Sequence, residues 1–281
     1  MITSAPFDDW WHNTFGLDVQ ILSPPHTVLL LGMITVQFGA MVSVLAYQNR
    51  MGNDSLFAKK ALAWCYYLSA GFMLVMVFTI ASEYLTRHDM HKTSFYVVCG
   101  LLFPLLMVAV SRAAPGKWGA TFMTLVYTAV LALMCWILPA FHAEPKLGPV
   151  LNHIDHYQAF HFPLLLIFPA MVMDWINQRM QSRSAFLKAL LMGVSFVAVM
   201  FAVQWPFGDF LTTTYARNWV FGVTSWYFGS RPDFEYRYSF VPEDVATGFN
   251  LVKGLAIAMG VAILSAWLGL SWGKWMKTVK R

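Results

Sequence analysis

The chain has 281 residues, of which 58% are hydrophobic and only 12% are charged. Soluble domains carry about 25% charged residues, so this composition excludes an ordinary water-soluble protein. The formal net charge of +5 does not indicate a nucleic-acid partner, because the basic residues gather at the ends of apolar segments rather than along one polar face.

Seven apolar segments are predicted to be membrane-spanning helices, since a helix needs roughly 20 apolar residues to cross about 30 Å of hydrocarbon. They cover residues 26–48, 61–85, 93–110, 120–141, 158–175, 185–207 and 251–272. Pro104 and Pro163 lie inside the third and fifth segments, where they predict kinks. We expect an all-α, polytopic membrane bundle of about seven transmembrane helices, forming one domain over residues 1–281 in a lipid bilayer.

The basic residues predict the orientation of this bundle. Twelve of the 19 Lys and Arg residues lie in four short segments that alternate with the predicted spans. They are Arg50, Lys59, Lys60, Arg112, Lys117, Arg179, Arg183, Lys188, Lys274, Lys277, Lys280 and Arg281. Because such segments stay in the cytoplasm, we expect the N-terminus outside and the C-terminus inside a bacterial-type inner membrane.

All the histidines are then predicted to lie on the opposite, outer side of the membrane. Its stretches are the N-terminal segment 1–25, the connections 86–92 and 142–157, and the long loop 208–250. The eight histidines in these stretches or at adjoining helix ends are His12, His26, His88, His91, His142, His153, His156 and His161. Polar outer loops explain the acidic residues found there, but the inner loops are also polar and contain no histidine.

The loop 208–250 is too long for a simple connection and is rich in aromatic residues, including Trp219, Trp226, Phe234 and Tyr238. This composition favours an interfacial helix or a cap over the outer end of the bundle.

The N-terminal segment holds the most informative spacing. Asp8 and His12 are four residues apart, so a short helix would place both on one face. Pro24 and Pro25 then direct His26 to the outer mouth of the first span. Two imidazoles and a carboxylate suit one divalent metal such as copper, zinc, iron or nickel. The alternative is a structural role, with Asp8 or Asp9 capping a short helix and His26 at headgroup level.

The order of residues in this segment is that of a known family. It resembles the C subunit of the copper membrane monooxygenases, the particulate methane and ammonia monooxygenases, at Asp8, Trp11, His12, Asp18 and Ser23 to His26. There a helix carries Asp-x3-His with Trp before the His, an acidic residue follows, and a Thr-Pro-Ser-His segment opens a span. The resemblance covers residues 8–26.

That resemblance implies that Asp8, His12 and His26 bind copper. Asp18 is then a further ligand or a partner that orients a histidine ring. The resemblance also implies other membrane subunits as partners, reductive activation of O2, and a small apolar substrate or ammonia.

A second group of candidates follows the second predicted span. Glu83 lies near the outer end of that span, where a charged residue is costly and therefore a functional candidate. His88 and His91 are three residues apart and suit one face of a helix. The alternative is that Glu83 pairs with Arg87 four residues later.

A third group lies before and inside the fifth predicted span. His153 and His156 are three residues apart, and His161 follows five residues later. These histidines exceed what a polar loop needs, so we expect them to contact a metal or a substrate.

These patterns are compatible with three functions and disfavour a fourth. The first is a copper-dependent membrane monooxygenase subunit, and the second is a non-catalytic copper-handling or assembly protein with the same ligands. The third is a single-haem or quinone-linked electron-transfer subunit, limited to one haem because the histidines occupy one side. An ion-coupled transporter is disfavoured, because its ionisable groups usually lie near the membrane midplane.

Overall fold

The computed structural model describes residues 4–16, 23–51, 55–144, 153–157, 162–223, 231 and 233–280. Within these residues the chain forms eight α-helices, several short 3-10 helices and no strand. The α-helices are α1 (Ser4–Phe15), α2 (Pro24–Gln48), α3 (Leu56–Ala81), α4 (Thr93–Ala113), α5 (Gly119–Ile137), α6 (Ile167–Arg179), α7 (Ala185–Thr212) and α8 (Gly248–Thr278). The all-α prediction is confirmed.

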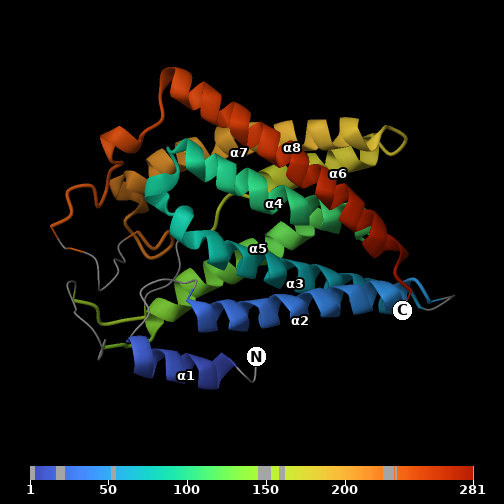
Figure 1. Cartoon of the computed structure of the whole chain (residues 1–281), viewed down its shortest axis with the longest axis horizontal. Coiled ribbons are helices and arrows are strands. Elements are labelled where there is room, and N and C mark those ends of the chain that lie inside the picture. The colour runs from blue at the N-terminus through green and yellow to red at the C-terminus, as the bar shows by residue number, and fades with distance from the viewer. Residues whose placement is uncertain are drawn as a thin grey trace.

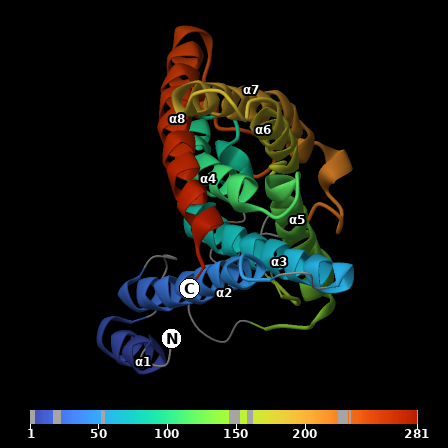
Figure 2. The ribbon, with the colours of Figure 1, turned by 90° about the vertical axis from the view of Figure 1, so that its right-hand side faces the viewer.

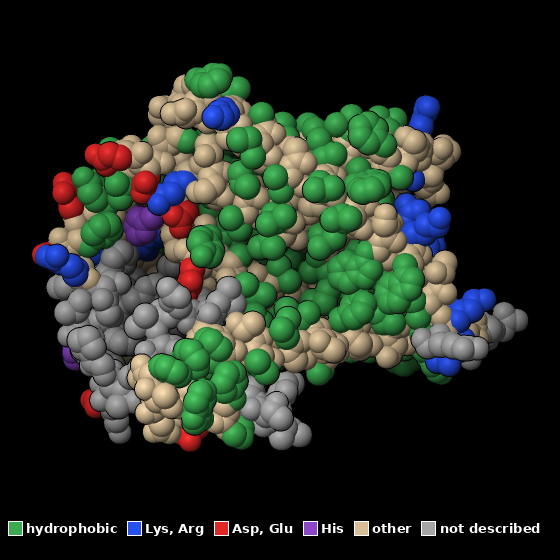
Figure 3. All heavy atoms as spheres, in the orientation of Figure 1, with side chains coloured by type: hydrophobic (Ala, Val, Ile, Leu, Met, Phe, Trp, Pro, Cys, Tyr) green, Lys and Arg blue, Asp and Glu red, His purple; other side chains and the backbone are tan. Residues whose placement is uncertain are grey.

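Six helices in the described part of the chain are long and apolar enough to cross a membrane. They are α2, α3 with the 3-10 turn that follows it, α4, α5 with its 3-10 turn, α7 and α8. The prediction of a multi-pass membrane protein is therefore confirmed. Figure 3 shows the corresponding apolar band, with only basic side chains among the charged ones at one end and with acidic, histidine and further basic side chains at the other.

The fifth predicted span, 158–175, differs from the other six. Residues 162–166 are not helical, and α6 contains only 13 residues, about 20 Å of helix. Residues 158–161 lie outside the described part. The reason lies in contacts with other helices: the backbone N–H of Leu164 donates to the Tyr127 hydroxyl, and that of Leu165 donates to Gln204 Oε1. Side chains of α5 and α7 thus satisfy donors that a longer helix would use itself.

Helix α4 lies at the centre of the bundle. In its most apolar stretch 61% of residues are buried, against 11% in α2. Viewed from the basic end, α8, α7, α6, α5 and α3 surround α4, while α2 lies outside against α3 and carries α1 on its outer side (Figure 2). The core therefore lies mainly among α3 to α8, and α2, the most exposed long helix, contributes Met41 and Leu45 to it.

Small residues allow α8 to approach α4 closely. A Cβ atom at Gly269 would lie 2.5 Å from the Leu105 carbonyl oxygen, and one at Gly273 would lie 2.6 Å from that of Ala109. Close approach of backbones through small residues is the usual way in which helices associate where no hydrophobic effect drives them together. These glycines are therefore required for the contact between α4 and α8.

Ser265 of α8 hydrogen-bonds the backbone of α4 on both sides of Pro104. Its hydroxyl donates to the Leu101 carbonyl at 2.8 Å and accepts from the Leu105 N–H at 2.9 Å. Proline both lacks an N–H and distorts the preceding turn. The serine hydroxyl therefore connects the Leu101 carbonyl with the Leu105 N–H, four residues later in the same helix.

The helices divide the molecule into two chemically distinct ends (Figure 1). The N-terminal ends of α2, α4 and α8 and the C-terminal ends of α3, α5 and α7 lie together at the end near α1. The described histidines belong to segments at this end, which we call the histidine end. The opposite end carries the Lys and Arg clusters and the C-terminus, and we call it the basic end.

Candidate metal centre

Helix α1 brings Asp8 and His12 onto one face. It extends over Ser4–Phe15 and ends at Gly16, whose φ of 87° favours glycine. The Gly16 N–H donates to the His12 carbonyl at 3.0 Å, a common way for a helix to end. The predicted short helix is confirmed. The alternative role for Asp8 as a helix cap is wrong, because Asp8 lies in the second turn.

The start of α2 positions His26. Ser23 precedes the helix, and Pro24 and Pro25 occupy its first two positions. Proline suits these positions, because the first N–H groups of a helix have no partner within it and the fixed φ is already helical. His26 is therefore the third residue of α2, in its first turn, facing α1.

The two helices bring three potential ligands together. Asp8 Oδ1 lies 3.4 Å from His12 Nε2 and 3.4 Å from His26 Nε2. One ligand atom from each residue lies within 4.8 Å of the others. In the described part of the chain, this is the one such group of at least three His, Cys, Asp or Glu side chains.

Three features of this cluster fit a metal ion. Ligand bonds of 2.0–2.1 Å in a tetrahedral site separate neighbouring ligand atoms by about 3.3 Å, close to the observed 3.4 Å. Asp8 Oδ1 is buried and has no hydrogen-bond partner among the described residues, which is costly for a carboxylate oxygen. A cation between the three ligands would remove that cost.

The third feature is the orientation of the His12 ring. His12 Nδ1 lies 3.0 Å from the Gly16 carbonyl oxygen. A carbonyl accepts only, so Nδ1 carries the proton in this contact and the neutral ring presents its Nε2 lone pair toward Asp8 and His26. Metal-binding histidines usually donate their other ring N–H to such an oxygen.

Sequence reasoning missed Gly16. The sequence does contain a signal for this residue, because a glycine directly after a predicted helix indicates the left-handed residue that ends it. What the sequence did not indicate is that the carbonyl of this residue turns back to His12.

The second group of candidates is not gathered into one site. Glu83 is exposed. The His91 ring is buried between the Trp205 ring at 4.0 Å and the Phe240 ring at 3.9 Å, nearly parallel to both. Its Nε2 lies 3.1 Å from the Trp205 carbonyl oxygen and 3.4 Å from Asp209 Oδ1. His91 thus connects Phe240, in the loop 208–250, with Trp205 and Asp209 of α7.

His88 and Arg87 hold the segment 233–247 over the histidine end. His88 Nε2 lies 3.3 Å from the Arg237 carbonyl oxygen, and the buried Arg87 guanidinium donates to the carbonyls of Arg237 and Val223. Arg217 stacks on the Tyr238 ring at 3.8 Å. In the described part of 208–250, α7 continues to Thr212 and α8 begins at Gly248, with only 3-10 helices and turns between them. The segment therefore forms a cap, with no interfacial α-helix among its described residues.

The His88 environment predicts a dependence of stability on pH. Burial, followed by repulsion from Arg87, lowers the pKa of His88. The unfolded chain therefore binds a proton more readily, so the His88 contribution is complete above the ordinary histidine pKa of about 6.5 and is lost as pH falls below it. We expect His88→Gln to reduce the fall in thermal unfolding midpoint between about pH 7 and about pH 5. The control is His153→Gln, at an exposed histidine, and an unchanged pH profile in His88→Gln would contradict the prediction.

The third group is described only in part. His153 is exposed, and His156 Nδ1 lies 2.7 Å from Asp155 Oδ1 on a short antiparallel bridge with His142. His161 and Asp18 lie outside the described residues, so their predicted roles remain predictions.

Comparison with family models, with curated proteins and with solved structures found no match to this chain. The geometry of the site and the residues themselves are therefore the guide to function.

Proposed function

We propose that this chain is a multi-pass membrane protein that binds one metal ion, preferentially copper, through Asp8, His12 and His26. The observation that carries the proposal is the buried Asp8 Oδ1, which has no hydrogen bond to any described residue and faces two imidazole nitrogens at 3.4 Å. Two imidazoles and one carboxylate are a donor set that suits copper, and zinc competes for the same set. His12 is already oriented for binding by Gly16.

The proposed topology has the N-terminus outside, the C-terminus inside and seven passages of the membrane. Six passages are the apolar helices. The seventh is residues 162–179, because α5 ends at the histidine end whereas α7 begins at the basic end (Figure 1). The basic end is cytoplasmic by the positive-inside rule. We propose a bacterial-type inner membrane as its location.

In this topology the metal centre lies at the outer surface of the membrane that the chain spans. Helix α1 carries a cluster of aromatic rings formed by Phe7, Trp10, Trp11 and Phe15. Trp10 and Phe15 are exposed. Exposed aromatic residues of this kind are enriched at membrane–water interfaces, which supports a position of α1 along the outer surface, beside the first turn of α2.

We further propose that the chain is a subunit of a copper-dependent membrane monooxygenase. The resemblance of residues 8–26 to the C subunit of that family supports this role, and bound copper would supply one-electron redox chemistry toward O2. Partner subunits are part of the proposal, and the long, exposed apolar face of α2 is available to them or to lipid. The substrate would be a small apolar molecule or ammonia.

Elemental analysis of purified protein tests the metal proposal. After removal of metal with a chelator and reconstitution with copper, we expect about one copper ion per chain to survive desalting, because a three-ligand site of this type retains its ion. Zinc reconstitution shows whether the site prefers copper. Copper content no higher than that of a membrane protein of similar size without such a cluster would contradict the proposal.

Partial exposure of the ligands favours one alternative, a copper-handling or assembly protein. The exposed fractions are 28% for His12, 37% for Asp8 and 40% for His26, so an ion held there remains accessible to another protein. Transfer of copper to a chelating acceptor without oxygen-dependent turnover of any substrate would favour this alternative. Turnover with partner subunits present would favour the monooxygenase.

A further inference from the structure

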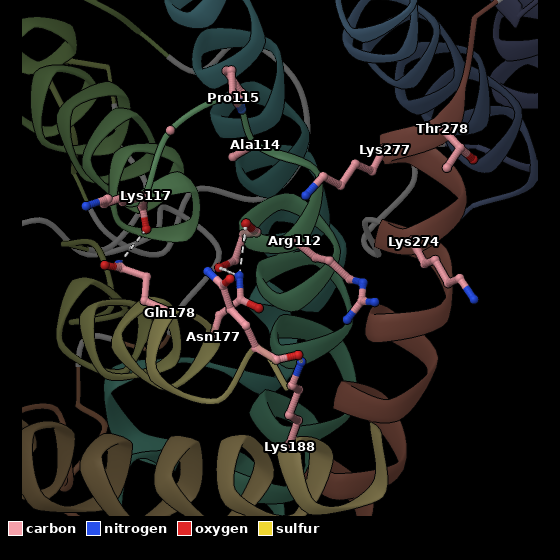
Figure 4. A pocket seen from close by; sticks show the side chains of 13 residues that line it. Arg112, Ala114, Pro115, Lys117, Asn177, Gln178, Lys188, Lys274, Lys277 and Thr278 are labelled. Atoms are coloured by element: carbon pink, nitrogen blue, oxygen red, sulfur yellow. Dashed lines mark hydrogen bonds between the residues drawn. The ribbon is translucent and has the colours of Figure 1, made fainter. Parts of the chain in front are cut away.

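The basic end contains a polar pocket that the metal centre does not use. It has a volume of about 470 Å³ and lies where the C-terminal ends of α4, α6 and α8 meet the start of α7. Five cationic side chains line it, and no acidic side chain is among the described residues that do so. The cations are Arg112, Lys117, Lys188, Lys274 and Lys277. Figure 4 shows Lys277 pointing toward the segment 114–117 and Lys274 pointing away from it.

No carboxylate in the described part of the chain neutralises these charges. Within the described ranges, none of the five cations forms an ion pair. Lys188 is only 5% exposed, and the bond seen for its ammonium is to the Gln181 carbonyl at 2.9 Å. An ammonium has three donors. Arg112 and Lys188 also repel each other, so this arrangement has an electrostatic cost that a bound anion would relieve.

The nearest buried acid does not supply that anion. Asp174 is fully buried in α6, and its carboxylate accepts from the Ser111 hydroxyl and from the backbone N–H groups of Ala120 and Thr121. It therefore caps the N-terminus of α5. Its hydrogen-bonding capacity is committed to that helix rather than to the pocket.

Interaction with helix ends does not account for the cations either. Each helix C-terminus carries roughly half a negative charge. Three such ends around the pocket give about −1.5 charges, and the N-terminal ends of α5 and α7 offset part of this. Leaving aside Lys274, which points away from the segment 114–117 (Figure 4), Arg112, Lys188 and Lys277 alone bring three positive charges to this space. The positive charge of these side chains therefore exceeds the partial negative charge of the helix ends.

We propose that this pocket binds an anion of the phosphate type, and that in the membrane this anion is the headgroup of an acidic phospholipid. Arg112 presents a planar guanidinium that matches phosphate oxygens in pairs, and the lysines add point charges. The pocket lies where the long helices end, which is the level of lipid headgroups whatever the orientation. Basic pockets between helices at the cytoplasmic side commonly bind acidic lipid headgroups. Free phosphate has the same chemistry and is the other source to be tested.

The experiment compares lipid binding by the full chain and two matched variants. Protein is exchanged into phosphatidylcholine nanodiscs with or without phosphatidylglycerol, and retained lipid is counted by native mass spectrometry. The first variant, Lys274→Gln with Lys277→Gln, changes exposed residues of α8, so folding is preserved. The control, Lys59→Gln with Lys60→Gln, removes the same charge from the same end, outside the pocket.

The pocket variant is expected to bind phosphatidylglycerol about tenfold or more weakly than wild type, judged from the typical contribution of each basic residue near acidic lipid. The control should lose much less. Arg112→Gln should weaken binding in the same way, and Arg112→Lys should restore part of it. Equal losses in the pocket variant and the control, or no loss in either, would overturn the proposal.

A second arm identifies the source of the anion. Inorganic phosphate is added to wild type in pure phosphatidylcholine nanodiscs, and the thermal unfolding midpoint is measured. A lipid site predicts that phosphatidylglycerol raises this midpoint more than phosphate does, and that the pocket variant abolishes the difference. A rise with phosphate alone that the pocket variant abolishes supports the anion site and assigns it to a soluble anion. No rise with either probe overturns the site.

Discussion

Replacing His12 and His26 together with alanine is expected to weaken copper binding by more than about 100-fold while leaving the helical bundle intact. Loss of a residue that merely orients a metal ligand costs 10–100-fold in affinity, and this variant removes two of three ligands. Both side chains lie outside the packed core of α3 to α8. Copper content after reconstitution and the thermal unfolding midpoint without metal are the two measurements.

His142→Ala with His153→Ala is the matched control. These histidines also lie at the histidine end, are exposed, and belong to no close group of ligands among the described residues. The control should retain the copper content of wild type. Equal copper in the two double variants would place the metal elsewhere in the chain, and a large fall in the metal-free unfolding midpoint of the first would show that its histidines act mainly in folding.

Replacing Gly269 with leucine is expected to destabilise the bundle by about 3 kcal/mol or more, at the upper end of what overpacking costs. The Cβ atom alone would lie 2.5 Å from the Leu105 carbonyl oxygen and 3.0 Å from Val108 Cβ. Backbone atoms cannot move aside like a flexible side chain, so α4 and α8 must separate. Because these helices share the most extensive interface in the fold, the unfolding midpoint should fall strongly.

Gly260→Leu on the same helix is the control for this prediction. Gly260 is exposed, and a Cβ there meets no atom within 4 Å. Since leucine also has a higher helix propensity than glycine, this variant should be at least as stable as wild type. Similar unfolding midpoints for the two variants would mean that α4 and α8 do not depend on close backbone contact.

Much of the fold follows from the sequence, because membrane-spanning helices need long apolar runs and such runs are visible directly. The spacing of Asp8, His12 and His26 also predicted the group that the structure brings together, since helix periodicity fixes Asp8 against His12 and the two prolines fix the start of α2. The predicted bounds of α7 and α8 were less accurate, because these helices continue past the apolar run into polar sequence.

The features that sequence reasoning missed depend on contacts between distant segments. The irregular residues before α6 require the Tyr127 hydroxyl and Gln204, which lie on other helices. His91 appeared to be a potential ligand, yet it is buried between Trp205 and Phe240, both more than 100 positions away along the chain. The basic residues were interpreted only as a topology signal, because their convergence around one pocket requires four separate segments.

The position of α1 gives the metal centre a mechanical consequence. Helix α1 packs chiefly against α2, and the proposed ligands come from both helices. Any ion that binds only when the two helices are together must, by thermodynamic linkage, hold them together with the same free energy. The N-terminal helix would then pack firmly against α2 when the metal is bound and separate from it more readily when the metal is absent. The metal state of the protein would therefore be detectable at its outer surface.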